Sequence, residues 1–201
     1  MCILNNLGMT VSNNNKILKN TLILTAITLI AGTALGFVYE VTKEPIAQAK
    51  EKETQEACLQ VFPSADAFEV ADVTLTDGID QVYTVKENGT DAGYVITTTS
   101  KEGYGGDIQI SVGITSDGTV NGISILSISE TAGLGMNAKK PEFYNQYAGK
   151  QTDHFYVSKD GGEGEAIDAL SGATITSRAV TGAVNNALDF YYNELGGPEN
   201  E

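Results

Sequence analysis

The sequence predicts an α+β protein with one N-terminal transmembrane helix, followed by a single domain of mainly antiparallel sheet and packed helices. Three observations predict it. Residues 20–39 contain no charged side chain, residues 67–129 alternate or cluster β-branched residues between turn signals, and residues 176–195 carry apolar residues at helical spacing. Strands followed by helices are typical of an α+β domain.

The apolar segment has the length of a membrane helix. Its twenty residues, NTLILTAITLIAGTALGFVY, rise by about 1.5 Å each and reach about 30 Å, the thickness of a bilayer's hydrocarbon core. A buried core helix is one alternative, although such helices seldom avoid charge for so long. A cleaved signal peptide is the other, but its apolar region spans only about 7–15 residues, and 32–34 (GTA) is a weak cleavage site. We therefore expect an uncleaved membrane anchor over residues 20–40.

Charge does not decide the orientation of this anchor. Two lysines precede the segment and three follow it closely, so the positive-inside rule gives no clear answer. A short leader is more easily kept inside than a large acidic domain. We therefore expect residues 1–19 in the cytoplasm, a helical stalk over 41–63 that Pro63 ends, and an extracytoplasmic domain over 64–201.

Turn signals divide the expected sheet into hairpins. The strand-like runs are FEVADVTL, QVYTVKENGTDAGYVITTT and GDIQISVGITSDGTVNGISILSIS. Asn88-Gly89 and Asp117-Gly118 interrupt the last two, and Asn-Gly and Asp-Gly are strong hairpin signals that favour an antiparallel sheet.

Helical patterns follow the expected strands. KKPEFYNQYAG (139–149) predicts a short helix that begins near Pro141, and KDGGEGEA (159–166) predicts a loop. The final helix places four residues on one face, as expected of a helix packed on a sheet: Val180, Val184, Leu188 and Tyr191.

Composition excludes several classes of function. The net charge is −14 and the only arginine is Arg178, which argues against a nucleic-acid partner because phosphate backbones require a basic face. Cys2 and Cys58 flank the anchor, so the membrane would separate them and prevent a disulfide. No Cys/His spacing suits zinc, and we expect no metal site.

The stretch DALSGATITSRA (168–179) lies where the final helix begins, at about Ile175 or Thr176. Gly172 and Ala173 have minimal side chains and permit close approach of a ligand to the backbone. Helix N-terminal amides favour an anion such as a phosphate. The same pattern also fits a simple N-cap at Thr174, and local physics alone favours that reading.

Two further turns are rich in small residues. In SETAGLG (129–135), Glu130 and Thr131 follow an apolar strand, and Gly133 and Gly135 would let the backbone wrap a flat ring. A turn with incidental polar residues fits equally well. In KEGYGGDI (101–108), Tyr104 offers a ring surface, although structural packing is its simpler role. Three such turns around one sheet suggest a shared binding cleft.

The motifs resemble those of a known family. DALSGAT resembles the Asp-x-x-Ser/Thr-Gly-Ala-Thr signature of extracytoplasmic FMN-binding domains, in which a phosphoester joins FMN to a threonine. SETAGLG is similar to the family's Glu-Thr-Pro-Gly-Leu-Gly segment, with Ala132 where proline is common. Together with the single anchor, these motifs are most similar to the G subunit of the Rnf electron-transport complex. The C subunit of sodium-translocating NADH:quinone oxidoreductase is a related member.

The resemblance implies a set of site residues. Thr174 would be the covalent FMN acceptor, with Thr176 as the alternative, and Asp168 would be the acid that a flavin transferase recognises. The phosphate would lie against Ser171, Gly172 and Ala173. The isoalloxazine ring or ribityl chain would approach Glu130, Thr131, Gly133 and Leu134.

The resemblance also implies a function. The protein would relay electrons among the other membrane and redox subunits of an ion-translocating ferredoxin:NAD oxidoreductase, without catalytic residues of its own. The chain lacks a Rossmann motif and an iron–sulfur cysteine pattern, so it should not oxidise NADH or ferredoxin alone. The alternatives are a membrane-tethered binding module without redox chemistry and an FMN-dependent reductase of a small extracellular acceptor.

Overall fold

The computed structural model describes residues 4–196, with side chains from residue 16 onward. The chain divides into two compact units, Met1–Glu51 and Lys52–Glu201, each considered by itself. Residues 1–3, which include Cys2, and residues 197–201 lie outside the described residues, as do the side chains of residues 4–15 of the expected leader.

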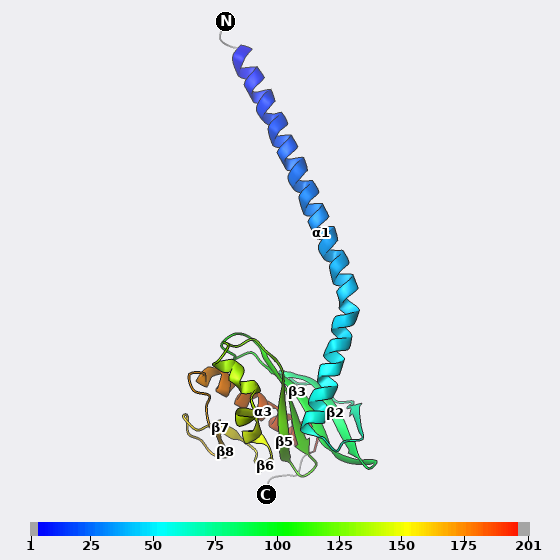
Figure 1. The fold of residues 1–201 in the computed structure, drawn as a ribbon, viewed down its shortest axis with the longest axis vertical. Helices are drawn as coiled ribbons and strands as arrows, with labels where there is room; N and C mark the ends of the chain where they lie inside the picture. Colours follow the sequence, from blue (N-terminus) through cyan, green and yellow to red (C-terminus); the bar gives the residue numbers. More distant parts are fainter. Residues whose placement is uncertain (1–3, 197–201) are drawn as a thin grey trace. The chain divides into compact units, whose positions relative to one another are not determined.

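The described part of the first unit is helical. It belongs to α1 (Leu4–Val61; Figure 1), which continues into the second unit and contains Pro45. Within the described part of the chain, Lys16–Val61 is the one helix that is long and apolar enough to cross a membrane. Its large apolar side chains are exposed, Leu29 and Ile30 by 65% and 70%. A core helix would bury such side chains, so the structure disagrees with the core-helix alternative.

The second unit is built on a six-stranded sheet in the order β1-β2-β3-β4-β5-β6. Every neighbouring pair is antiparallel, which confirms the predicted sheet. The strands are β1 (Ala67–Val70), β2 (Ile79–Glu87), β3 (Thr90–Ser100), β4 (Ile108–Thr115), β5 (Thr119–Ile128) and β6 (Lys150–Gln151).

Both predicted hairpin turns are present. Asn88 and Gly89 have φ values of 51° and 77°, the left-handed backbone of a tight two-residue turn between β2 and β3. Gly118 has φ 86°, and its N–H donates to the Thr115 carbonyl between β4 and β5. These turns therefore set the registers of both hairpins.

One strand prediction and one loop prediction were wrong in extent. FEVADVTL forms a strand only to Val70, because after the Ala71 N–H···Val82 O bond the chain leaves the sheet edge and turns back through Gly78 into β2. The predicted loop KDGGEGEA ends in a strand, β8 (Glu165–Ile167), which pairs in parallel with β7 (Phe155–Val157). Three-residue strands carry too little periodicity to be seen in the sequence.

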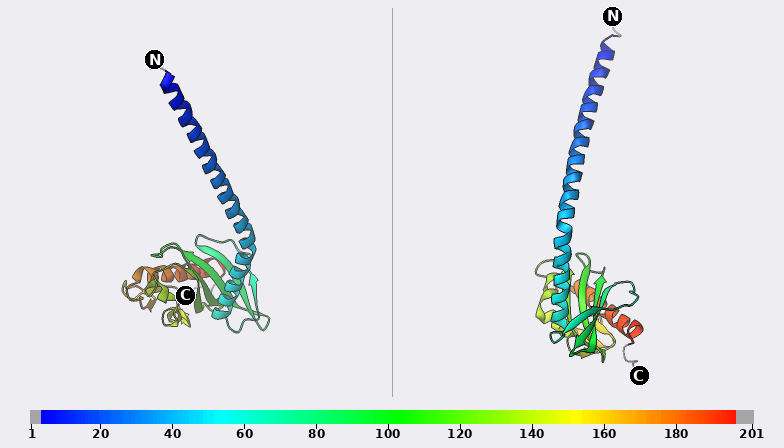
Figure 2. Two further views of the ribbon diagram at one scale, coloured as in Figure 1. Left: turned by 45° about the horizontal axis from the view of Figure 1, so that its top comes forward. Right: turned by 90° about the vertical axis from the view of Figure 1, so that its right-hand side faces the viewer.

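The final helix, α3 (Thr174–Glu194), packs against one face of the sheet, as both views in Figure 2 show. Its four predicted core residues are all buried: Val180, Val184, Leu188 and Tyr191. Opposite them are the inward-facing side chains of β4, Ile108, Ile110, Val112 and Ile114. This is the main core of the domain.

The opposite face of the sheet carries a smaller core. Val95 points to it while its neighbour Ile96 points to the main core, as the alternation of a strand requires. The last turn of α1 packs there through Cys58 and Val61, and Cys58 is a buried free thiol.

Short helices connect β5 to β6. They are the 3-10 helix η1 (Gly135–Lys139), α2 (Pro141–Tyr144) and a second 3-10 helix, η2 (Asn145–Tyr147). The helix predicted near Pro141 is therefore present, with proline at its first position.

Candidate functional site

Three turns that lie far apart in the sequence meet at one cavity of about 640 Å³. One is the connection between β3 and β4, the second follows β5, and the third leads into α3. The cavity is lined by Tyr104, Glu130, Thr131, Leu134, Gly135, Gly172, Ala173, Thr174, Ile175 and Thr176. This volume lies within the range of about 300–1,000 Å³ that small-molecule and cofactor sites occupy.

The N-terminus of α3 forms the polar end of the cavity. Thr174 is the first helical residue, one or two positions earlier than the expected start, and Ala173 occupies the cap position without a side-chain capping bond. The reading in which Thr174 caps the helix is therefore wrong. The first intrahelical bond runs from the Ser177 N–H to the Ala173 carbonyl. The amides of residues 174–176 precede this bond, which makes the helix end a favourable place for an anion.

Three hydroxyls near this helix end have different environments. Thr174 is half-buried and lines the cavity. Thr176 is only 1% exposed, and a Cβ atom placed on Gly135 would lie 2.6 Å from its Oγ1. Ser177 is fully buried, where its Oγ accepts the Leu170 N–H at 2.9 Å and donates to the Ala173 carbonyl at 3.0 Å. Thr174 therefore presents the most accessible of the three hydroxyls.

Glu130 joins two of the three turns. Its side chain is buried, and its Oε1 accepts the backbone N–H of Tyr104 at 2.7 Å. The same two turns touch through their backbones, because a Cβ atom on Gly105 would lie 2.1 Å from the Ser129 carbonyl oxygen. Glycine is required at position 105 for this approach.

Apolar side chains surround the mouth of the cavity. Tyr104, Leu134 and Ile175 are 72%, 42% and 47% exposed. Tyr104 and Leu134 come from the first two turns, and Ile175 comes from the start of α3. Leu134 lies over the third turn, where Gly172 has φ 74° and a Cβ atom on it would be 3.1 Å from Leu134 Cδ2. The site therefore combines an anion-binding end with an apolar rim, which fits the phosphate and the flat ring of the expected FMN.

Not every predicted residue lies in the cavity lining. Ser171 and Gly133 are exposed neighbours of it. Asp168 is exposed after β8, where its carboxylate accepts a hydrogen bond from Ser158 Oγ at 3.1 Å and its N–H donates to Gln146 Oε1. Ile175 lines the cavity but was not predicted, although it directly follows the DALSGAT motif.

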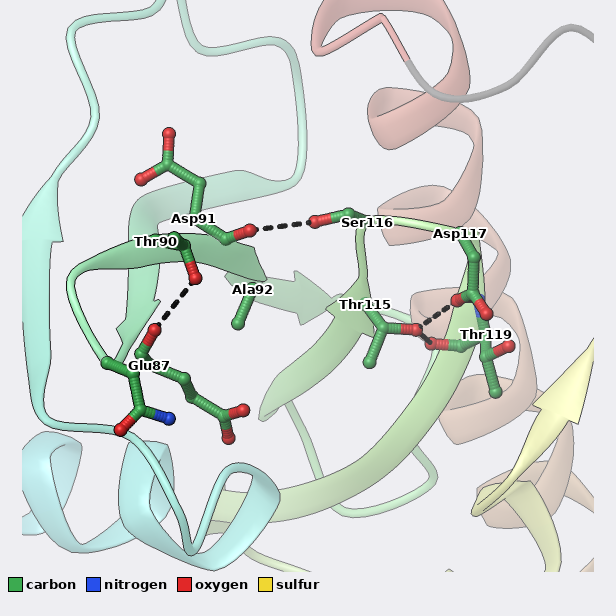
Figure 3. A pocket seen from close by; sticks show the side chains of 9 residues that line it. Glu87, Thr90, Asp91, Ala92, Thr115, Ser116, Asp117 and Thr119 are labelled. Carbon is green, nitrogen blue, oxygen red and sulfur yellow. Dashed lines mark hydrogen bonds between the residues drawn. The ribbon is translucent and has the colours of Figure 1, made fainter.

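A second hollow of about 570 Å³ lies at the β2–β3 and β4–β5 turns (Figure 3). Its oxygens largely satisfy one another: Thr90 donates to the Glu87 carbonyl, Ser116 to the Asp91 carbonyl and Thr115 to Asp117. The described residues that line it include three carboxylates and no cation, so the hollow does not suit a phosphate.

Comparison with known families gives two matches. The sequence model of the FMN-binding domain matches residues 103–189, which include all the described residues that line the cavity. The model of the RnfG N-terminal region matches residues 9–61, within α1.

Similar proteins share most of their length with this chain. The G subunit of the proton-translocating ferredoxin:NAD(+) oxidoreductase complex of Clostridium ljungdahlii is 36% identical, over 92% of this chain and 97% of its own. The G subunit of the Na(+)-translocating complex of Acetobacterium woodii is 34% identical, over 88% and 92%. The G subunit of an ion-translocating oxidoreductase complex of Methanosarcina acetivorans is 30% identical, over 92% and 100%.

Two solved structures are also similar, each at 24% sequence identity. For the C subunit of the Na(+)-translocating NADH-quinone reductase of Parabacteroides distasonis the TM-score is 0.48, over 56% of this chain and 60% of that one. For NqrC of Shewanella oneidensis the TM-score is 0.44, over 66% of this chain and 67% of that one.

Proposed function

The chain belongs to the family of G subunits of ion-translocating oxidoreductase complexes, and from this premise we propose that it is a membrane-anchored flavoprotein that relays electrons within a ferredoxin:NAD oxidoreductase complex. The single observation that carries the proposal is the cavity at the N-terminus of α3, where the three turns predicted from the sequence meet. FMN supplies the reversible uptake and release of electrons, and the protein positions it.

Thr174 is the proposed point of attachment. Its hydroxyl lies in the cavity lining beside the free amides of the α3 N-terminus, which would hold the phosphate. A flavin transferase would form the bond between Thr174 Oγ1 and the FMN phosphorus, with loss of the hydroxyl proton and of the donor's leaving group. The resulting diester keeps one negative charge at the positive end of the helix dipole.

Burial favours Thr174 over Thr176. The transferase must reach the hydroxyl, and Thr176 is 1% exposed beneath Gly135. Asp168 is exposed outside the cavity, where a second protein can contact it. This position agrees with a role in transferase recognition rather than in FMN binding.

A covalent bond also compensates for the shortage of cations. The only arginine, Arg178, is paired with Asp160 in an ion pair on the surface. No lysine or arginine lines the cavity among the described residues. Attachment would keep the flavin in place without a cationic clamp.

The anchor is proposed to cross the membrane once over residues 20–40, with the N-terminus in the cytoplasm. Four threonines in and beside this segment bond to carbonyls one turn back, as in Thr21 to Ile17 at 2.9 Å and Thr33 to Leu29 at 2.8 Å. Such bonds satisfy hydroxyls that hydrocarbon cannot. The other membrane and redox subunits of the complex are the proposed electron donor and acceptor.

Loss of the Thr174 hydroxyl tests the attachment. We expect Thr174→Ala, expressed with a flavin transferase, to give a denatured band without flavin fluorescence, because no acceptor oxygen remains. Thr174→Ser keeps the oxygen and should stay fluorescent, and Thr176→Val, a near-isosteric control, should stay fluorescent as well. A complex that contains Thr174→Ala should lose ferredoxin-dependent NAD reduction. A fluorescent Thr174→Ala band would contradict the assignment.

A further inference from the structure

We propose that Glu130 is a positioning residue: it fixes the 101–107 loop through the Tyr104 amide, so that the Tyr104 ring forms a wall at the mouth of the cavity. This role differs from direct contact with the isoalloxazine ring or ribityl chain, which the family resemblance implies. The purpose of the wall rests on the proposed function, because the wall would face the bound flavin. The link between Glu130 and the loop does not depend on it.

The carboxylate of Glu130 is held between two backbone segments. Oε1 accepts the Tyr104 N–H at 2.7 Å, across 26 positions of sequence. Oε2 lies beside Gly135, where an added Cβ atom would be 2.8 Å away. The side chain is 9% exposed, and a hydrogen bond between a buried carboxylate and an amide is among the stronger ones in proteins.

The described residues give the Tyr104 ring no comparable hydrogen bond of its own. It is 72% exposed, and among the described residues its hydroxyl and ring make no hydrogen bond or aromatic contact. Glycines flank it, and Gly106 has φ 131°, which other residues rarely adopt. The place of the loop over the cavity, and with it that of the ring, therefore depends on the hydrogen bond from the Tyr104 N–H to Glu130 and on the close approach of Gly105 to Ser129.

The expected consequence is a shielded flavin. Tyrosine offers a flat apolar face with a polar edge, which suits stacking against an aromatic ring at a solvent boundary. Tyr104, Leu134 and Ile175 form the rim, and among the described residues of the cavity lining Tyr104 is the only aromatic one. Release of its loop would open this wall to water and to small solutes.

Amide hydrogen exchange on the flavin-free full-length chain in detergent tests the link directly. Glu130→Met keeps the length of the side chain without an oxygen acceptor, and we expect the Tyr104 amide to exchange about tenfold faster or more. Glu130→Gln keeps an acceptor oxygen and should stay within about threefold of wild type. Equal exchange in Glu130→Met and wild type, or equal acceleration in both variants, would overturn the proposal.

The amide of Val112 in β4 serves as the internal control for folding, and its exchange should not change. Should Glu130→Met fail to fold, Glu130→Leu, which also lacks an oxygen acceptor, replaces it in the exchange measurement. Tyr104→Ala tests the wall separately, through flavin shielding. In the flavin-loaded chain, iodide should quench the flavin at least about twofold more strongly in Tyr104→Ala and in Glu130→Met than in wild type. Glu130→Gln should match wild type. Unchanged quenching in Tyr104→Ala would show that the ring is not a wall.

The two measurements separate failure of this inference from failure of the proposed function. A chain that never acquires flavin contradicts the proposed function, while the exchange of the Tyr104 amide still decides whether Glu130 holds the loop. A chain that acquires flavin but shows no effect of Glu130→Met on exchange contradicts the inference alone.

Discussion

At the scale of single residues, three similar hydroxyl side chains near the start of α3 have different environments, because they are buried to different degrees. Thr174 faces the cavity, Thr176 packs under Gly135, and the Ser177 Oγ accepts the Leu170 N–H to fix the preceding turn. Sequence motifs locate this group of hydroxyls but do not show which of them is accessible, because the burial of Thr176 depends on the approach of Gly135 from a distant turn. Tertiary structure supplies what the local pattern leaves open.

Cys58 provides a prediction about pH. Burial raises the pKa of its thiol from 9.0 to about 11. The folded state therefore holds the proton more tightly than the unfolded state. The contribution of the protonated Cys58 thiol to the free energy of unfolding is complete below pH 9 and is lost as the pH rises toward 11. In a Cys2→Ser background, we expect the thiol to resist maleimide at pH 8 and to react on unfolding. The urea concentration at the midpoint of unfolding should decrease as the pH is raised from 9 to 11.

A Cys58→Ala variant is the control for that pH dependence. Its midpoint should change less over the same interval, because alanine does not titrate. Rapid labelling of the native protein at pH 8 would contradict the buried, protonated thiol.

At the scale of elements, the sheet was predictable because its signals are local. Asn88-Gly89 and Asp117-Gly118 mark the two long hairpins, and Pro141 marks the start of α2. The parallel pair β7–β8 was not predictable, since each strand has three residues and their pairing crosses a glycine-rich loop. Likewise, no local pattern shows that the end of α1 packs on the sheet.

Gly113 shows how closely α1 approaches the sheet. An added Cβ atom there would lie 2.9 Å from Val61 Cβ and 3.0 Å from the Phe62 ring. We expect Gly113→Ala to lower the free energy of unfolding by about 1–3 kcal/mol, as overpacking of a core does. Urea denaturation of the purified chain measures it.

Gly122 is the matched control, because it is the register partner of Gly113 on β5 and an added Cβ atom meets nothing within 4 Å. Gly122→Ala should leave stability unchanged or raise it by about 0.5–1 kcal/mol. Equal destabilisation by both variants would show that the loss comes from the strand backbone and not from the contact with α1.

At the scale of the whole molecule, the proposed topology places the leader and the domain on opposite sides of the membrane. In a cysteine-free background, we expect Lys159→Cys, at an exposed position, to react with a membrane-impermeant maleimide on intact cells. Ser12→Cys in the leader should react only after permeabilisation. The reverse pattern would indicate the opposite orientation, and a mature chain whose intact mass lacks the leader would indicate a cleaved signal peptide.

The family and the cavity were both accessible from the sequence, since two motifs and an apolar segment occur in a specific order. The role proposed for Glu130 was not accessible, because it depends on a hydrogen bond to an amide 26 positions away. In the proposed organisation, three separate turns line a cavity of the anchored domain. The first would supply a wall, the second a positioning carboxylate and the third a phosphate site.

The most direct test of this account is the position of the flavin on the peptide chain. Trypsin releases residues 160–178, which contain every candidate hydroxyl of the third turn. After co-expression with a flavin transferase, tandem mass spectrometry should find the mass of one FMN less one water on this peptide, with fragment ions that place it at Thr174. A modification at Thr176, on another peptide, or on no peptide would contradict the account.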